Sequence, residues 1–570
     1  MLNLKKINTQ KHLVVIFWLI ALMLGAIYAW FYRHSMNPDG ISYLDIGDAY
    51  LHCGWKKAIN GYWSFFYSGL LGLTMYLLKP TAYWEFTVVH LVNFLVYVCA
   101  LASFQFFMSE LLSFRRKQTA MAADKADTIL PDWIILILGY TLFIWSSLHL
   151  ITVSVVTPDM CNAAFVYLAS GILLYLKRNP DSCFGFVILG LVLGFSYLTR
   201  AIMLPLSFIF LGLGVFLIAN VKRAITLALI AVFCFLLIAG PYITALSYVK
   251  GHLTFGDTGK LAYACCVNNV PFVHWQGEPP GSGTPKHPSR RIFDNPEIYE
   301  FSSPIEGTYP VWYDPSYWLE GVVLHFDLRG HLKVLGLVLQ KYYNSTFFSV
   351  FMYLILGFIF YLIGRRKLLG LKDISEYRII LVPAVTAISI CSLVHLEERY
   401  IGVFFVLILM GLFSGLHLPK NHKLKRLIVY IVLFISLQIS LLIGIRAIPK
   451  ARKVAYDIIK GEDVRSHIQW QVANGLKKMG IQPREKVAIV GTGLHAYWAR
   501  LARVKIVAEI IVENDKIFWA LNDSVKSKVL KTLTETGAKL IVAQNLPSYI
   551  SASGWQRIGN TDYYVYVLEK

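Results

Sequence analysis

Three carboxylates stand close together in one polar stretch of an otherwise apolar sequence. Asp39, Asp45 and Asp48 lie within residues 34–48, directly after the first apolar segment. Ionised groups at a membrane boundary are costly unless they serve a site or face water, so this cluster is a candidate functional site. On one helix Asp45 and Asp48 would share a face with each other and not with Asp39. The alternative interpretation is a solvated loop.

Further charged residues stand at the ends of later apolar segments. Asp159 follows Thr157-Pro158, and Arg200 and Arg399 each border an apolar run. Simpler roles compete with a functional one for each of them. Asp159 could mark a helix N-terminus, where the helix dipole favours a carboxylate. Arg200 could be an anchor that reaches the lipid headgroups, and Arg399 could pair with the glutamates that precede it.

The chain that must position these groups has the composition of a membrane protein. Of its 570 residues 56% are hydrophobic and 15% charged, and the mean hydropathy is +0.54, values that soluble domains do not reach. Apolar segments of roughly 20 residues, enough to cross a bilayer, recur along the first 446 positions. The sequence predicts a polytopic α-helical protein with about eleven transmembrane helices, at residues 13–31, 83–109, 131–151, 160–176, 183–198, 203–219, 224–246, 346–364, 377–394, 400–417 and 425–446.

Basic residues give the expected orientation. Every second loop is basic, as in Lys5 and Lys6, Arg115 and Arg116, and Arg365, and such loops remain in the cytoplasm. The N-terminus is therefore expected to be cytoplasmic. Anionic lipid at that face accounts for most of the net charge of +20. No basic stripe of the kind that binds nucleic acid is present, so nucleic acid is not expected as a partner.

Two long loops and a terminal domain fall on the opposite face. The loops occupy residues 32–82 and 247–345 of the transmembrane domain 1–446, and the segment 320–343 is predicted to lie along the membrane surface. Residues 450–570 predict a small extracytoplasmic α/β domain, with a helix over 454–479 and strands over 486–490, 539–542 and 563–568. The odd number of membrane segments places it outside the cytoplasm. The eight cysteines form no disulfide framework and no CxxC metal motif.

A glycine motif in the terminal domain has two interpretations. Gly491, Gly493 and Ala496 follow a predicted strand, which fits a dinucleotide fingerprint if Ala496 replaces its third glycine and Glu509 serves as the ribose acid. The pattern is short, and a domain on the outer face would meet little dinucleotide. A plain turn from strand to helix is the favoured interpretation.

Taken in order, five short motifs resemble a known family. They are Pro-Asp39-Gly-Ile-Ser-Tyr, Gly61-Tyr-Trp-Ser, Thr157-Pro-Asp159, Tyr197-Leu-Thr-Arg200 and His395-Leu-Glu-Glu-Arg-Tyr400. Together they resemble the membrane glycosyltransferases of the C-type fold, in particular the protein O-mannosyltransferases and the lipid A aminoarabinose transferases. The resemblance covers about the first 420 residues. Phe65-Phe66 stands where the family often has Pro-Leu, and the C-terminal domain matches no member closely.

The resemblance implies transfer of a sugar from a polyprenyl-phosphate donor to an acceptor outside the cytoplasm. Asp39 is then the expected general base, a role that contributes about 10² to 10⁴ in rate. Arginine side chains suit the leaving phosphate because their fork binds two oxygens. The further expected site residues are Asp159, Asp45 and Glu398 as acids, Arg200, Arg399 and Lys57 for the phosphate, and Tyr43, Trp63 and His395 for sugar or acceptor. Attack opposite the phosphate predicts inversion of the anomeric centre.

Cofactor and partners follow from the same reasoning. The reaction requires no cofactor. His395 lies beside Glu397 in the sequence, so dependence on a divalent metal ion stays open. The expected partners are the lipid-linked sugar, membrane lipid and an acceptor that is a lipid, a polysaccharide or a protein. The expected location is a bacterial inner membrane, crossed many times.

Three other functions compete with this one. A transporter or flippase of a lipid-linked saccharide would show broken helices and charges at mid-depth, whereas the acids here gather at segment ends. A saccharide polymerase or ligase would need similar carboxylates and arginines and differ only in product size. A membrane-anchored binding protein would act through its outer C-terminal domain.

Overall fold

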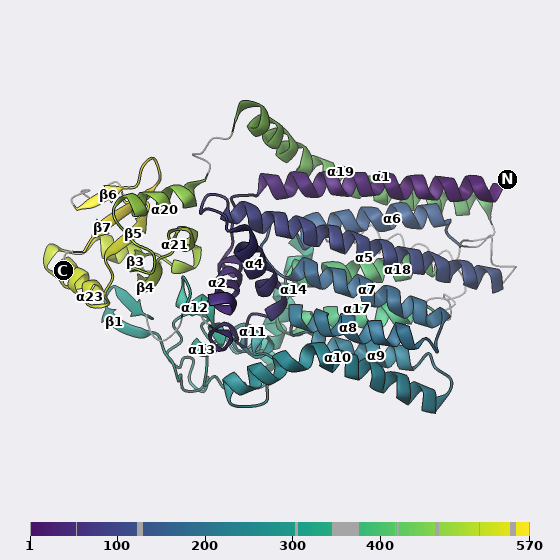
Figure 1. Cartoon of the computed structure of the whole chain (residues 1–570), viewed down its shortest axis with the longest axis horizontal. Coiled ribbons are helices and arrows are strands. Elements are labelled where there is room, and N and C mark those ends of the chain that lie inside the picture. The colour runs from purple at the N-terminus through teal and green to yellow at the C-terminus, as the bar shows by residue number, and fades with distance from the viewer. Residues whose placement is uncertain are drawn as a thin grey trace.

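A computed structural model of the chain describes residues 2–52, 54–121, 129–301, 306–344, 375–416, 418, 421–461, 467–511, 514–547 and 554–568. Figure 1 shows a bundle of long helices that run along the long axis of the molecule, with a β-sheet at one end. The N-terminus lies at the far end of the bundle and the C-terminus in the sheet domain. We call the end that carries the sheet the sheet end.

The bundle consists of apolar helices. They are α1 (Leu2–Phe31), α5 (Glu85–Met121), α6 (Asp132–Trp145), α7 (Asp159–Arg178), α8 (Cys183–Thr199), α9 (Met203–Val215), α10 (Val221–Lys250), α17 (Arg378–Val394), α18 (Glu398–Ser414) and α19 (His422–Lys460). A π-helical turn, η2 (Ser146–Leu150), extends α6. Large apolar side chains face outward along α10, including Leu229, Phe233 and Leu237, as expected of a surface that meets lipid.

The bundle confirms the predicted class of polytopic helical protein with a small C-terminal α/β domain. Ten of the predicted membrane segments fall on the helices given above, and the segment 346–364 lies outside the described residues. Within the described part of the chain, six helices are long and apolar enough to cross a membrane. Others, such as α9 with 13 residues, are shorter than a full crossing.

The first loop, residues 32–82, is largely helical. It contains α2 (Pro38–His52), α3 (Trp55–Ala58) and α4 (Phe65–Leu78). Pro38 occupies the first position of α2, where its missing N–H is not needed. Helices α2 and α4 cross at Gly47 and Gly72, where a Cβ on Gly47 would lie 2.8 Å from the Gly72 Cα. The two glycines therefore let α2 pack closely on α4.

The second loop, residues 247–345, is a series of short elements. They are α11 (Thr258–Cys266), β1 (Arg290–Asp294), β2 (Glu297–Glu300), α12 (Pro310–Tyr313), α13 (Pro315–Trp318) and α14 (Leu328–Asn344). Helix α14 covers the segment predicted to lie along the membrane, and its Leu332, Leu337 and Leu339 are exposed. An exposed apolar face on an amphipathic helix suits that position.

The sheet joins the second loop to the C-terminal domain. Its seven strands have the order β1-β2-β4-β3-β5-β7-β6, where β3 is Lys486–Val490, β4 Lys505–Ile510, β5 Leu540–Gln544, β6 Trp555–Arg557 and β7 Tyr563–Val567. Strands β4, β3 and β5 are parallel, and β2 of the loop pairs antiparallel with β4, so that Tyr299 lies opposite Glu509. The loop hairpin thus extends the sheet of the terminal domain, a pairing that the sequence analysis did not predict.

The described residues of the C-terminal domain also form shorter helical elements, namely α20 (Ile468–Lys478), the 3₁₀ turn η4 (Gly493–His495), α21 (Tyr497–Ala502), α22 (Asp515–Trp519) and α23 (Asp523–Glu535). The single helix predicted over 454–479 is two helices in the structure. Helix α19 continues out of the bundle to Lys460 and ends at Gly461, whose φ of 83° favours glycine. The predicted strands match β3, β5 and β7.

Candidate active site

Four charged residues form an alternating cluster at the sheet end of the bundle. Arg399 Nη2 donates to Asp39 Oδ2 at 3.0 Å, and Arg399 Nε lies 3.7 Å from Asp159 Oδ2. Arg200 Nη1 donates to Asp159 Oδ1 at 2.7 Å. We call Asp39, Arg399, Asp159 and Arg200 the charge cluster. Two acids and two cations thus share one site, and the Asp159 side chain is 1% exposed.

Helix ends position all four side chains. Asp39 lies in the first turn of α2, Asp159 is the first residue of α7, and Arg399 lies in the first turn of α18. Arg200 is the C-cap of α8. Carboxylates are favoured at helix N-termini because the unsatisfied N–H groups carry partial positive charge. The cap role considered for Asp159 and its place in the cluster are therefore compatible.

Arg200 is held on both sides. Its guanidinium carbon lies 4.0 Å from the centre of the Tyr400 ring, which is within cation–π range. Burial alone would lower the pKa of Arg200, but the Asp159 carboxylate and Tyr400 raise that pKa above its ordinary value. Arg200 is consequently a fixed cation rather than an anchor that reaches into the headgroups.

Aromatic side chains lie beside Asp39, and we call Trp312, Phe272, Tyr62 and Trp63 the aromatic wall. Trp312 Nε1 donates to Asp39 Oδ1 at 3.3 Å. The ring of Phe272 lies 5.0 Å from that of Trp312, and the rings of Tyr62 and Trp63 are 4.6 Å apart. Trp63 Nε1 donates to the Trp312 carbonyl at 2.9 Å. Asp39 thus has a cation on one oxygen and an indole N–H on the other.

Tyr43 lies beside the charge cluster but is buried, with an exposed fraction of 4%. Its ring packs edge to face on Trp63 at 5.0 Å and on Tyr67 at 5.2 Å. Burial is the largest influence on the pKa of Tyr43, which is raised well above 10, and the charges of all four cluster residues act on the phenol. Tyr43 supports the wall through Trp63.

Two further predicted site residues, His395 and Glu398, lie at the N-terminal end of α18. His395 Nδ1 lies 3.3 Å from Cys266 Sγ, and Glu397, which is 3.0 Å from Lys341 Nζ, lies 3.7 Å from His395 Nε2. Burial, the largest influence, lowers the pKa of His395. Burial, the largest influence, raises the pKa of Glu398, on which the charges of Lys341, Glu397 and Arg446 also act.

The structure places Lys57 and Asp45 in other ion pairs. Lys57 Nζ lies 2.7 Å from Glu306 Oε1, and the Lys57 side chain is 55% exposed. Asp45 accepts from Arg500 Nη1 at 2.7 Å and from the Thr308 backbone N–H at 2.6 Å. Asp45 therefore connects α2 to the C-terminal domain and does not join the charge cluster.

The charge cluster places two guanidinium groups beside the Asp39 carboxylate. Among the described residues, no group of three or more His, Cys, Asp or Glu side chains is placed to hold a metal ion. The cations available at the site are Arg200 and Arg399. They have the shape and charge to bind two oxygens of a phosphate each.

The glycine turn of the C-terminal domain is closed by Glu509. This buried carboxylate accepts from the Gly493 backbone N–H at 2.7 Å and from the Tyr309 hydroxyl at 2.9 Å, and it lies 2.6 Å from His274 Nε2. A ribose would have to displace these partners from the carboxylate. The structure therefore favours the plain strand-to-helix turn over the dinucleotide interpretation.

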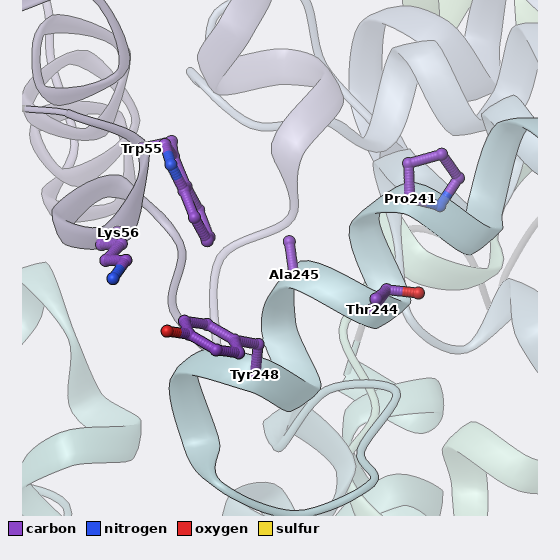
Figure 2. A pocket seen from close by; sticks show the side chains of 6 residues that line it. All are labelled: Trp55, Lys56, Pro241, Thr244, Ala245 and Tyr248. Carbon is purple, nitrogen blue, oxygen red and sulfur yellow. The ribbon is translucent and has the colours of Figure 1, made fainter.

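A cavity of about 700 Å³ lies between α3 and the last part of α10. Figure 2 shows that Trp55, Lys56 and Tyr248 line one side, while Pro241 and Thr244 lie further along α10. Lys56 Nζ lies 5.1 Å from the centre of the Tyr248 ring. The hydroxyl of Tyr242, the residue after Pro241 on α10, donates to the Trp63 carbonyl at 3.3 Å. Helix α10 therefore connects this cavity to the aromatic wall.

Trp312, Phe272 and Tyr400 are site residues to which the sequence analysis gave no role. Tyr400 closes the motif that begins at His395, and the segment 308–318 is dense in proline and aromatic residues. That density was the available signal for Trp312. Nothing in the sequence connects Phe272 to Asp39, because their proximity depends on how the second loop folds.

Comparison with known proteins shows that this chain is similar in fold to several solved structures. No family model matches the sequence, and no curated protein matches it. The solved structures similar to this chain include ArnT, the lipid A aminoarabinose transferase, from Cupriavidus metallidurans in the apo state, at 13% identity and a TM-score of 0.46, covering 96% of this chain and 97% of that one. ArnT bound to undecaprenyl phosphate is similar at 12% identity and a TM-score of 0.46, covering 97% of each chain.

An oligosaccharyltransferase from Archaeoglobus fulgidus, in complex with zinc and sulfate, is also similar, at 12% identity and a TM-score of 0.45, over 93% of this chain and 68% of that one. These proteins are membrane glycosyltransferases of the C-type fold, the group that the sequence motifs resemble. A likeness at this level describes the arrangement of the chain and assigns no reaction.

Proposed function

We propose that this protein is an integral-membrane glycosyltransferase that moves a sugar from a polyprenyl-phosphate donor to an acceptor outside the cytoplasm. The observation that carries the proposal is the charge cluster, in which Asp39 and the two arginines Arg200 and Arg399 meet at the ends of apolar helices. A base beside two fixed cations, at the edge of a bundle that faces lipid, matches the needs of that reaction.

Asp39 acts as the general base. The acceptor oxygen attacks the anomeric carbon, its proton passes to the Asp39 carboxylate, and the bond between the sugar and the phosphate oxygen breaks. The electron pair of that bond leaves with the polyprenyl phosphate. Attack from the side opposite the phosphate inverts the anomeric centre. Trp312 orients the carboxylate through its indole N–H.

Arg200 and Arg399 bind the phosphate of the donor. Both carry fixed charge at the site, and their guanidinium forks match phosphate oxygens. The phosphate that leaves is more negatively charged than the phosphodiester of the donor. The two arginines therefore stabilise the transition state more than the ground state, which is the condition for catalysis. Asp159 keeps both guanidinium groups in place.

The donor enters from the lipid through the cavity between α3 and α10. Its lining is mostly apolar with one cation, Lys56, which suits a polyprenyl chain that carries a phosphate. The sheet end then faces away from the cytoplasm, in agreement with the basic loops at the other end of the bundle. A bacterial inner membrane, with the N-terminus in the cytoplasm, is the location proposed here.

The test is donor consumption by the purified protein in lipid, with a panel of polyprenyl-phosphate sugars and crude envelope extract as acceptor. We expect release of polyprenyl phosphate by the parent and a loss of about 10² to 10⁴ in the Asp39→Asn variant. Asp294→Asn, at an exposed carboxylate of β1, is the matched control. Equal rates for parent and Asp39→Asn would remove Asp39 as the base.

The same assay separates the proposal from a transporter of lipid-linked saccharides. A transporter would bind the donor and move it across the bilayer without releasing polyprenyl phosphate. The size of the product separates transfer of one sugar from transfer of a whole saccharide chain. The charges of the cluster lie at helix ends, whereas a transporter would be expected to carry charges in the middle of broken helices.

A further inference from the structure

The short helix α21 of the C-terminal domain lies against α2, the helix that carries Asp39. Two of its side chains face α2: Tyr497 at its first position and Arg500 one turn later. The glycine turn closed by Glu509 leads directly into this helix. Because Glu509 fixes the turn, it also fixes the start of α21.

Arg500 joins three carboxylates from two elements of the transmembrane domain. Its Nη1 lies 2.7 Å from Asp45 Oδ1 and 2.7 Å from Asp48 Oδ2, both on α2. Its Nε lies 2.7 Å from Glu85 Oε1 at the start of α5. We call Arg500 and its three carboxylates the interface cluster. Arg503 adds a second cation, with its Nη2 2.6 Å from Glu85 Oε2.

Three members of the interface cluster, Arg500, Asp45 and Glu85, are buried. The side chain of Arg500 is 4% exposed and that of Glu85 is fully buried. Buried charges are costly unless each is paired with good geometry, and removal of one partner leaves the others uncompensated. Burial alone would lower the pKa of Arg500, but Glu85, Asp48 and Asp45 raise that pKa well above its ordinary value. Arg500 is therefore charged at any physiological pH.

The interface cluster fixes the position of Asp39 through α2. Asp39 and Asp45 are six residues apart on one helix, which is about 9 Å along its axis. A helix of this length moves as a rigid rod, so a shift at Asp45 moves Asp39 as well. Thr308 adds two hydrogen bonds to Asp45, at 2.6 Å from its backbone N–H and at 3.0 Å from its hydroxyl.

Tyr497 lies on the side of Asp39 that faces the C-terminal domain. With Pro38, Trp312 and Leu494 it lines a small cavity between α2 and the glycine turn. The charge of Asp39 acts on the Tyr497 phenol. The hydroxyl of Tyr497 is 3.2 Å from Nδ1 of His495, which is exposed. Tyr497 thus borders this cavity and also contacts the exposed His495.

We propose that α21 is part of the active centre. In this proposal Arg500 positions α2, the helix that carries Asp39, and the acceptor contacts Tyr497 when it binds beside Asp39. This inference rests on the proposed transfer reaction. It assigns the C-terminal domain a role in catalysis and acceptor binding, and leaves donor binding to the transmembrane domain. Donor and acceptor then approach the charge cluster from opposite sides.

The positioning role is tested with Arg500→Lys, which keeps the charge and loses the fork. Misplacement of a catalytic group by about 1 Å lowers the rate roughly 100-fold, so we expect kcat to fall 10- to 100-fold while KM for the donor stays within twofold of the parent. Active sites are counted by donor binding, so that a smaller folded fraction does not count as a slower enzyme. Arg557→Lys, at the exposed pair with Asp562, is the matched control.

Asp48→Asn provides a second route if Arg500→Lys does not fold. The Asp48 side chain is 37% exposed, so its replacement removes one partner of Arg500 without leaving a buried carboxylate unpaired. We expect the same separation of kcat from donor KM, with a smaller effect. An unchanged kcat in Asp48→Asn, or in folded Arg500→Lys, would overturn the positioning role.

The role of Tyr497 in acceptor binding is tested with Tyr497→Ala. We expect KM for the acceptor to rise at least fivefold, with KM for the donor within twofold of that of the parent. Lys528→Ala, on the exposed face of α23, is the control. An unchanged acceptor KM would overturn the role of Tyr497. If the parent protein consumes no donor, the proposed transfer reaction is wrong. If the parent is active and the variants match it, only the role of α21 is wrong.

Discussion

The guanidinium of Arg399 donates to the carboxylate of Asp39 at 3.0 Å, although the two residues are 360 positions apart in the sequence. The pair joins the first turn of α2 to the first turn of α18. Arg399 also lies 3.7 Å from Asp159, so one cation touches both acids. In the proposed reaction the base and the phosphate-binding group are therefore assembled before the donor arrives.

Replacement of Arg399 by lysine is expected to lower kcat and to weaken donor binding together. Lysine keeps the charge but cannot contact Asp39, Asp159 and a phosphate at once, because it lacks the planar fork. We expect kcat/KM for the donor to fall roughly 10- to 100-fold, since a hydrogen bond to a charged group contributes about 1.5–3 kcal/mol. Steady-state kinetics with varied donor measure this. A value equal to that of the parent would contradict the shared role of Arg399.

Arg200→Gln is expected to act mainly on donor binding. This substitution removes a cation and leaves Asp159 with a single cationic partner, Arg399. The donor Kd should rise roughly 10- to 100-fold, and Arg200→Lys should restore part of the affinity. Binding of polyprenyl phosphate alone, measured without acceptor, isolates this effect from the chemical step. Arg291→Gln, in an exposed ion pair of the loop hairpin, is the control.

Trp312→Phe is expected to slow the chemical step without changing donor binding. The substitution keeps an aromatic ring against Phe272 and Trp63 but is smaller than the indole, and it removes the N–H that orients Asp39. The loss of one hydrogen bond to a charged group predicts a fall in kcat of roughly tenfold. Single-turnover rates at saturating donor report this step. A change in donor Kd with kcat intact would place Trp312 in binding instead.

His395→Gln is expected to change how stability depends on pH. Burial, the largest influence, lowers the pKa of His395 in the folded protein below 6.5, although the neighbouring Glu397 carboxylate opposes this effect. The unfolded chain therefore binds more protons in this range, and the contribution of His395 to stability is present above pH 6.5 and is lost as the pH falls through the folded pKa. Glutamine does not titrate. Melting temperatures of the variant should decline less than those of the parent below pH 6.5.

The orientation in the membrane can be tested by labelling with a membrane-impermeant maleimide. Lys528→Cys lies on the exposed face of α23 in the sheet domain, and Lys222→Cys lies at the opposite end of the bundle, at the start of α10. In intact cells we expect labelling above that of the parent at position 528 and not at 222. Permeabilised cells should label both. The reverse pattern would place the charge cluster in the cytoplasm.

The sequence by itself determined the class of the protein and named several residues of the candidate site. Hydropathy locates most of the bundle helices because a membrane segment must be apolar over its whole length, which is a local property. Charged residues at the ends of such segments stand out for the same reason. The motifs that contain Asp39, Asp159, Arg200 and Arg399 also resemble those of a known family, so these four could be named as candidates, and the structure brings all four together.

Only the tertiary structure decided the partners of those residues. Asp45 belongs to the same polar stretch as Asp39, yet it pairs with Arg500, 455 positions away, because the C-terminal domain packs against α2. The pairing of β2 with β4 and the contact of Trp312 with Asp39 likewise join segments that are far apart. Long-range contacts of this kind depend on how loops and domains close, which no local periodicity records.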